Sequence, residues 1–198
     1  GSFSPNMPAP ATPEMPQTAK DANAFLAPLI RFYEQERLAP LKFELQEVES
    51  LPETPRHLLC HARDMTTRLE RHHQSPIGLK ALYVSQTPDS YFREVLLFAE
   101  KTGKPVEYGA IEINTEVFPE KLRSDVLQGQ KPLGGLLLEH KFDFISNPQT
   151  YFRVESDDQI QNHLQVPSPS KLYGRANILT TSSGDTIANI VEILPEST

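Results

Sequence analysis

Alternating apolar and polar residues predict that most of the chain after residue 75 forms β-strands. The stretches "SYFREVLLFAE" and "PVEYGAIEIN" are separated by "KTGK", which is typical of a β-hairpin. The last part, "YGRANILTTSSGDTIANIVEILP", predicts two more strands joined by a turn at "SSGD". Further strands are expected at "GLKALYVS" and earlier at "LKFELQEV", whose period is that of a half-buried strand.

Apolar residues recur at helical spacing near the beginning of the chain. Between Asp21 and Arg37 they predict a helix that Pro28 either starts or breaks. Another helix is expected after Asp64, a residue suited to the N-cap position, and two more in "FPEKLRSDVLQGQ" and from Pro132 onward. Helices inserted between mainly antiparallel strands predict an α+β fold, a single domain in which a mostly antiparallel sheet has flanking helices.

Two segments differ from this pattern. Residues 1–20 are rich in Pro, Ser and Thr and have almost nothing to bury, so they are expected to form a disordered tail that precedes a domain at residues 21–198. The stretch 146–170, "SNPQTYFRVESDDQIQNHLQVPSPS", is long and polar and resembles an insertion. It could form a lid over a site.

The composition argues against several classes of protein. A formal net charge of −7 is unfavourable for non-specific binding to nucleic acid or anionic membranes, although one buried arginine can still hold an anionic ligand. No apolar run reaches the roughly 18 residues of a membrane helix, and no signal peptide is recognisable. The single cysteine, Cys60, cannot form an internal disulfide and fits a reducing compartment, so a cytoplasmic location is expected.

The sequence contains no recognisable metal or nucleotide motif. His72 and His73 are adjacent and point apart on a helix, so they do not supply two metal ligands on one face. A Walker A loop, a GxGxxG turn and a GxSxG elbow are all missing. Metal binding, nucleotide binding through these loops and catalysis by a nucleophilic serine in a GxSxG elbow are therefore not expected.

Two charged residues occupy positions that should be buried. Arg93 lies within "YFREVLLFA" and Glu192 within "IANIVEILP", each with apolar neighbours on its own strand face. A lone buried charge costs several kcal/mol, so each needs a partner or a ligand. Three alternatives remain open: the two residues pair with each other, either faces solvent from an edge strand, or they bind a ligand. Because Glu94 directly follows Arg93, one of these two could simply point outward.

The segment "KPLGG" predicts a helix start with exposed backbone N–H groups. Such groups and the helix dipole attract anions. An ordinary turn into a helix would give the same pattern, so this segment alone does not define a site.

Five segments in order resemble a known family. "RDMTTRLE", "YFREVLL", "KPLGGLL", "LYGR" and "VEILP" are similar to segments of the chorismate pyruvate-lyase family, the 4-hydroxybenzoate synthases. The similarity covers most of residues 56–195 and is greatest to the branch of plastoquinone-making organisms such as cyanobacteria. It implies a single domain with a mostly antiparallel sheet over a buried pocket.

The resemblance also implies a function. Members of the family eliminate pyruvate from chorismate and release 4-hydroxybenzoate for plastoquinone or ubiquinone biosynthesis, without a metal or organic cofactor. Arg93 matches the family arginine that binds the ring carboxylate, and the backbone amides of Met65 and Leu133 match others that hold it. Glu192 matches the carboxylate at the ring's 4-hydroxyl, so Arg93 and Glu192 are the expected catalytic residues.

Two hypotheses follow. The first is a lyase with chorismate as substrate and 4-hydroxybenzoate as product. The alternative is a non-catalytic sensor domain for a small aromatic carboxylic acid, since some relatives use this scaffold for sensing. Neither hypothesis involves nucleic acid, because nothing here resembles a helix-turn-helix. Neither involves membrane insertion, because no apolar run is long enough. Glu192 favours the lyase, because a sensor has no need of a carboxylate at that place.

Overall fold

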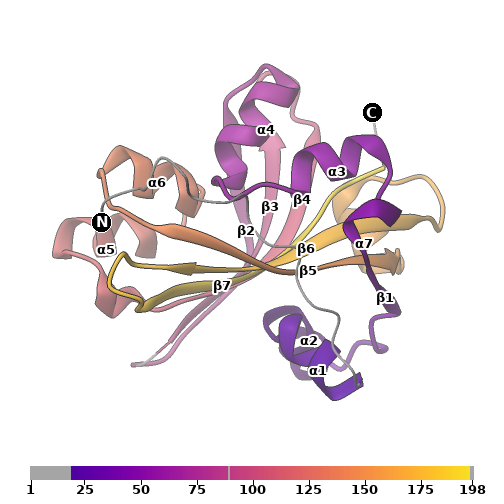
Figure 1. Cartoon of the computed structure of the whole chain (residues 1–198), viewed down its shortest axis with the longest axis horizontal. Coiled ribbons are helices and arrows are strands. Elements are labelled where there is room, and N and C mark those ends of the chain that lie inside the picture. The colour runs from indigo at the N-terminus through magenta and orange to yellow at the C-terminus, as the bar shows by residue number, and fades with distance from the viewer. Residues whose placement is uncertain (1–18, 89, 197–198) are drawn as a thin grey trace.

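The predicted strands form one antiparallel sheet in the computed structural model, which describes residues 19–88 and 90–196 (Figure 1). Within these residues the sheet has seven strands in the order β1-β5-β6-β7-β4-β3-β2. Both predicted hairpins are present, as β3 with β4 and as β6 with β7. The strands are β1 (Phe43–Gln46), β2 (Ile77–Gln86), β3 (Tyr91–Ala99), β4 (Pro105–Ile113), β5 (Ile145–Glu155), β6 (Lys171–Thr180) and β7 (Thr186–Ile193).

Helices begin where the sequence places their start signals. Pro28 lies in the first turn of α2 and separates it from α1, and the Asp64 carboxylate accepts a hydrogen bond of 2.8 Å from the Thr67 N–H at the start of α4. Pro119 and Pro132 are the N-cap residues of α5 and α6. The α-helices are α1 (Ala19–Phe25), α2 (Ala27–Gln35), α3 (Glu53–Leu59), α4 (Met65–His73), α5 (Glu120–Leu127), α6 (Leu133–Glu139) and α7 (Asp158–Leu164), with short 3-10 helices at Val48–Ser50 and Thr115–Val117.

Helices cover both faces of the sheet. In Figure 1, α1 and α2 lie below it and α3 and α4 above it. One apolar cluster joins α2 and α7 to the lower face around Tyr108 and Phe152. The upper face carries two separate clusters, one beneath α5 and α6 and the other beneath α3 and α4. The strip of the sheet between the two upper clusters carries charged side chains as well as apolar ones.

The segment 146–170 is part of the fold, so its interpretation as an insertion is wrong. Most of it forms β5, which pairs with β1 and β6, and the rest includes α7. Thr150, Tyr151 and Phe152 are buried in β5. The strand was missed because Pro148 precedes a shift in its register with β6 and polar residues dominate its composition.

Two expectations are affected by which residues are described. The tail predicted at residues 1–20 lies outside the described residues apart from positions 19–20, which begin α1, so the tail and the domain boundary stay predictions. Among the described residues, no helix is long and apolar enough to cross a membrane.

Candidate functional site

All four residues predicted for the site line one cavity on the upper face of the sheet. Arg93 comes from β3, Glu192 from β7, Met65 from the start of α4 and Leu133 from the start of α6. The space open to the centre of a water-sized sphere is about 70 Å³, against roughly 10–15 Å³ for one water molecule. Much of the remaining lining is apolar and comes from Leu79, Val95, Leu97, Ile111, Leu179 and Ile190. No residue of the segment 146–170 lines the cavity, so the structure does not support the predicted lid.

Arg93 is buried, and no carboxylate among the described residues is paired with it. Its side chain is 1% exposed, and its Nη2 donates a 3.1 Å hydrogen bond to the Lys131 carbonyl, just before α6. Its Nε and Nη1 have no hydrogen-bond partner among the described residues. Burial lowers the pKa of the guanidinium, but an arginine stays charged at any ordinary pH. The cavity therefore contains a positive charge with free donors.

Glu192 is paired with Arg175 rather than with Arg93. The two residues face each other on β7 and β6, and 3.0 Å separates Arg175 Nε from Glu192 Oε2. Arg175 Nη1 also donates to the carbonyls of Leu59 and His61, which lie at the end of α3 and beyond it. The alternative in which Arg93 and Glu192 form a structural ion pair is therefore wrong.

Glu107 on β4 is a second carboxyl in the cavity. It is 4% exposed, and its Oε1 has no hydrogen-bond partner in the described part of the chain. Burial raises the pKa of Glu107 well above its usual value, and the nearby Glu192 charge raises it further, while Arg175 opposes the change. Because Arg175 is already paired with Glu192, burial favours the uncharged form of Glu107. Its signal in the sequence was a charged residue within "PVEYGAIEI", a strand apolar on both faces.

One charged group of the cavity, Arg93, has no ion-pair partner among the described residues. Arg175 and Glu192 neutralise each other, and burial favours the uncharged form of Glu107. Asp64 also lines the cavity, but its carboxylate is used to cap α4. The Arg93 guanidinium therefore lies without an ion-pair partner among the described residues, in an apolar surrounding where it binds an anion more strongly than in water.

The two helix starts that line the cavity touch each other. The first N–H groups of α4 and α6 have no partner within their own helices, and those of Met65 and Leu133 belong to this set. Gly134 allows the close approach, because a Cβ at this position would lie 3.0 Å from the Asp64 Cβ and 3.2 Å from the Thr66 Oγ1. The Arg93 bond to Lys131 holds the guanidinium beside the same helix start.

Glu94 does not face solvent, although it was expected that Arg93 or Glu94 could do so. It is buried on the opposite face of the sheet, where its Oε2 accepts hydrogen bonds from the Tyr108 hydroxyl and, at 3.0 Å, from Gln159 of α7. Burial raises the pKa of Glu94 to about 7, and the charge of Glu36 contributes to the increase. Because Arg93 and Glu94 are adjacent in β3, their side chains lie on opposite faces of the sheet, Arg93 in the cavity and Glu94 beneath α7.

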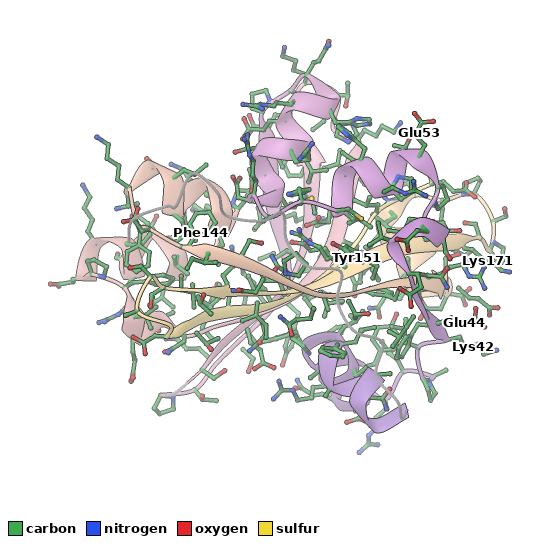
Figure 2. All side chains as sticks on the ribbon, in the orientation of Figure 1. Lys42, Glu44, Glu53, Phe144, Tyr151 and Lys171 are labelled. Carbon is green, nitrogen blue, oxygen red and sulfur yellow. The ribbon has the colours of Figure 1, made fainter. Side chains whose placement is uncertain are left out.

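A second hollow lies at the β1 edge of the sheet. Figure 2 shows Lys42, Glu44 and Lys171 gathered at this end of the molecule. Arg153, which also lines the hollow, is paired with Glu44. Because this pair is exposed and its charges compensate each other, the hollow lacks the unpaired buried charge that distinguishes the Arg93 cavity.

Among the described residues, no three His, Cys, Asp or Glu side chains are placed to hold a metal ion. His61 forms hydrogen bonds through both ring nitrogens, to the Leu58 carbonyl and from the Arg63 N–H. Burial lowers the pKa of His61 to about 3, and the Arg175 charge lowers it further. His61 is therefore neutral, and its hydrogen bonds give it a structural role beside Arg175.

Comparisons with known proteins support the fold. No family model matches the sequence, and neither does any curated protein. PhnF from Mycobacterium smegmatis matches 96% of this chain and 90% of its own at 11% identity, with a TM-score of 0.55. The effector domain of PhnF matches 68% of this chain and 89% of its own at 10% identity, with a TM-score of 0.52. A GntR-family transcriptional regulator from Enterococcus faecalis matches 60% and 93% at 12% identity, with a TM-score of 0.46.

The chain has the chorismate lyase-like fold. The predicted single domain, with an antiparallel sheet and flanking helices, is confirmed. The resemblance to the chorismate pyruvate-lyase family is supported at the level of this fold and no further. The prediction of an enzyme is contradicted, because the two structures reported above with TM-scores over 0.5 are PhnF and its effector domain rather than lyases.

Proposed function

We propose that this chain is a ligand-binding domain for a small aromatic carboxylic acid, which it binds without transforming. The observation that carries the proposal is the buried guanidinium of Arg93, whose Nε and Nη1 are unpartnered among the described residues and which lines a cavity. A carboxylate can accept charge-assisted hydrogen bonds from these free donors.

The surroundings of Arg93 favour an organic anion over an inorganic one. The apolar side chains of β3, β4 and β7 line the rest of the cavity and suit the body of an aromatic acid. The backbone amides of Met65 and Leu133, at two helix starts, are the additional donors that we assign to the carboxylate. In this proposal Glu192 lies toward the far end of the ligand.

The pairing of Glu192 supports binding without catalysis. A carboxylate that acts as a general base has to accept a proton, and an ion pair with Arg175 stabilises the form without a proton. Glu192 thus has a structural reason to be in this place, which removes the argument that only a lyase requires it. The effector domain of PhnF, which shares the fold, is consistent with the same use of the scaffold.

Calorimetric titration of the purified chain with benzoate and with benzamide tests the proposal. Benzamide has nearly the same shape but no charge, so benzoate should bind at least about tenfold more tightly, as expected for a charge-assisted hydrogen bond of roughly 1.5–3 kcal/mol. In the Arg93→Met variant this preference should disappear. Equal binding of benzoate and benzamide by the wild-type chain would contradict the proposal.

Incubation with chorismate tests the absence of catalysis. We expect no pyruvate above the level formed by chorismate alone. Pyruvate release that scales with protein concentration and is lost in Arg93→Met would overturn the non-catalytic part of the proposal.

A further inference from the structure

Glu107 has no role in carboxylate binding, yet it is buried in the same cavity. It shares its strand face on β4 with Gly109 and Ile111, and all three residues line the cavity. Ile111 is the register partner of Arg93. Glu107 lies four residues from Ile111, about 13 Å along the strand at roughly 3.3 Å per residue. Glu107 and Arg93 are therefore attached to the sheet at opposite ends of the cavity.

Gly109 leaves the space between these two ends open. It lies midway between Glu107 and Ile111, and a Cβ at this position would be 4.0 Å from the Glu107 Oε2 and 3.0 Å from the Val191 carbonyl. Since glycine has no side chain, nothing from β4 fills the middle of the cavity. A flat ring whose carboxylate is bound at Arg93 would extend across Gly109 toward Glu107.

At the end of the cavity opposite Arg93, Glu192 and Glu107 differ in whether they accept or donate hydrogen bonds. Glu192 is paired with Arg175 as a carboxylate, and a carboxylate only accepts hydrogen bonds. Glu107 is buried and its Oε1 lacks a partner among the described residues, and the uncharged form that burial favours has one O–H to donate. A hydroxyl group both donates and accepts, so it suits a carboxylate and a carboxylic acid together.

We propose that Glu107 donates a hydrogen bond to the group of the ligand opposite its anchored carboxylate, and that it thereby selects a hydroxyl in this position. This inference rests on the proposed function, because it assumes that the carboxylate of the ligand is bound at Arg93. It assigns a specificity-determining role to Glu107 and narrows the ligand class to hydroxylated aromatic acids.

The experiment compares three acids by calorimetric titration: benzoate, 4-methylbenzoate and 4-hydroxybenzoate. The methyl group has nearly the size of the hydroxyl but cannot form a hydrogen bond. Wild-type protein should bind 4-hydroxybenzoate at least about fivefold more tightly than 4-methylbenzoate, the factor expected for one net hydrogen bond. Equal affinities for these two acids would overturn the inference without any mutation.

Two variants test whether Glu107 acts as a neutral donor. Glu107→Gln keeps an uncharged donor, so the hydroxyl preference should stay within about threefold of wild type. Glu107→Leu removes the donor and should reduce the preference by about fivefold. A loss in Glu107→Gln as large as that in Glu107→Leu would show that a charged acceptor is required and would overturn the inference. Glu94→Gln, which changes a buried carboxyl on the opposite face, is the matched control and should leave the preference unchanged.

Failure of this inference can be distinguished from failure of the proposed function. Benzoate lacks the para substituent and reports the Arg93 site alone. If benzoate binds and depends on Arg93 while the hydroxyl preference ignores Glu107, only the inference is overturned. If none of the three acids binds, both proposals are overturned.

Discussion

Arg175 and Glu192 form an ion pair between neighbouring strands, with 3.0 Å between Nε of the arginine and Oε2 of the glutamate. The pair is almost completely buried, and Arg175 also holds the carbonyls of Leu59 and His61. This arrangement provides Glu192 with its counter-charge and leaves Arg93, two strands away, available for a ligand. Two arginines therefore line one cavity: Arg175, which is paired and stabilises the fold, and Arg93, whose charge has no ion-pair partner among the described residues.

The same substitution at these two arginines should have very different effects on stability. Arg175→Met leaves Glu192 without its counter-charge, together with two carbonyls that lose a donor, and should lower the free energy of unfolding by about 3–5 kcal/mol. Arg93→Met removes a buried charge that has one hydrogen bond, and the unfolding free energy should change by less than about 1.5 kcal/mol or increase. Urea unfolding of both variants measures the difference. A larger loss of stability in Arg93→Met than in Arg175→Met would contradict the distinction.

The contact between α4 and α6 can be tested with two adjacent glycines. Gly134→Ala would place a Cβ 3.0 Å from the Asp64 Cβ, so we expect a loss of about 1–3 kcal/mol in stability and weaker binding of benzoate as the helix starts move apart. Gly135→Ala is the control, because its Cβ would make an ordinary 3.9 Å contact with the Thr66 Cγ2. That variant should be as stable as wild type or more stable by up to about 1 kcal/mol, because alanine favours a helix. Equal effects of both substitutions would show that the contact is not close.

Glu94 should make stability depend on pH. Its pKa is about 7 in the folded protein, above the usual 4.5, so the folded state retains a proton that the unfolded state has already lost. The stability that this group contributes is present at low pH and is lost as the pH rises from about 4.5 to about 7. In Glu94→Gln this loss is absent, so the variant should gain on the order of 1–3 kcal/mol relative to wild type between pH 5 and pH 8.

Urea unfolding of wild type and Glu94→Gln at these two pH values provides the measurement. Glu107 titrates in both proteins and therefore cancels in the comparison. Parallel pH profiles for the two proteins would mean that the pKa of Glu94 is not raised.

Much of the local structure could be predicted from the sequence, because short-range signals define it. Alternating apolar residues gave the strands of the two hairpins, and Asp64, Pro119 and Pro132 marked helix starts that the structure confirms. β5 and α7 were missed, since a bulge after Pro148 interrupts the alternation of the strand. Their signals were present nonetheless: Asp157 caps α7 by accepting a 2.9 Å hydrogen bond from the Ile160 N–H.

The sequence also determined that charged groups would be buried in the sheet. Arg93 and Glu192 stood out because their strand neighbours are apolar, and the chemistry of a guanidinium made a carboxylate ligand a reasonable hypothesis. The resemblance added Met65 and Leu133, which line the cavity as well. These inferences depend on residue type and on local pattern, which are properties of the chain itself.

Only the tertiary structure decided which of these charges is free. Strand order places Arg175 next to Glu192 and leaves Arg93 without a carboxylate, although the sequence separations are 17 and 99 residues. The raised pKa of Glu107 has the same origin, because burial and the nearby Glu192 charge both disfavour its charged form. Electrostatic interactions depend on distance in space and on exclusion of water, and both are fixed only when the strands pair and the helices cover them.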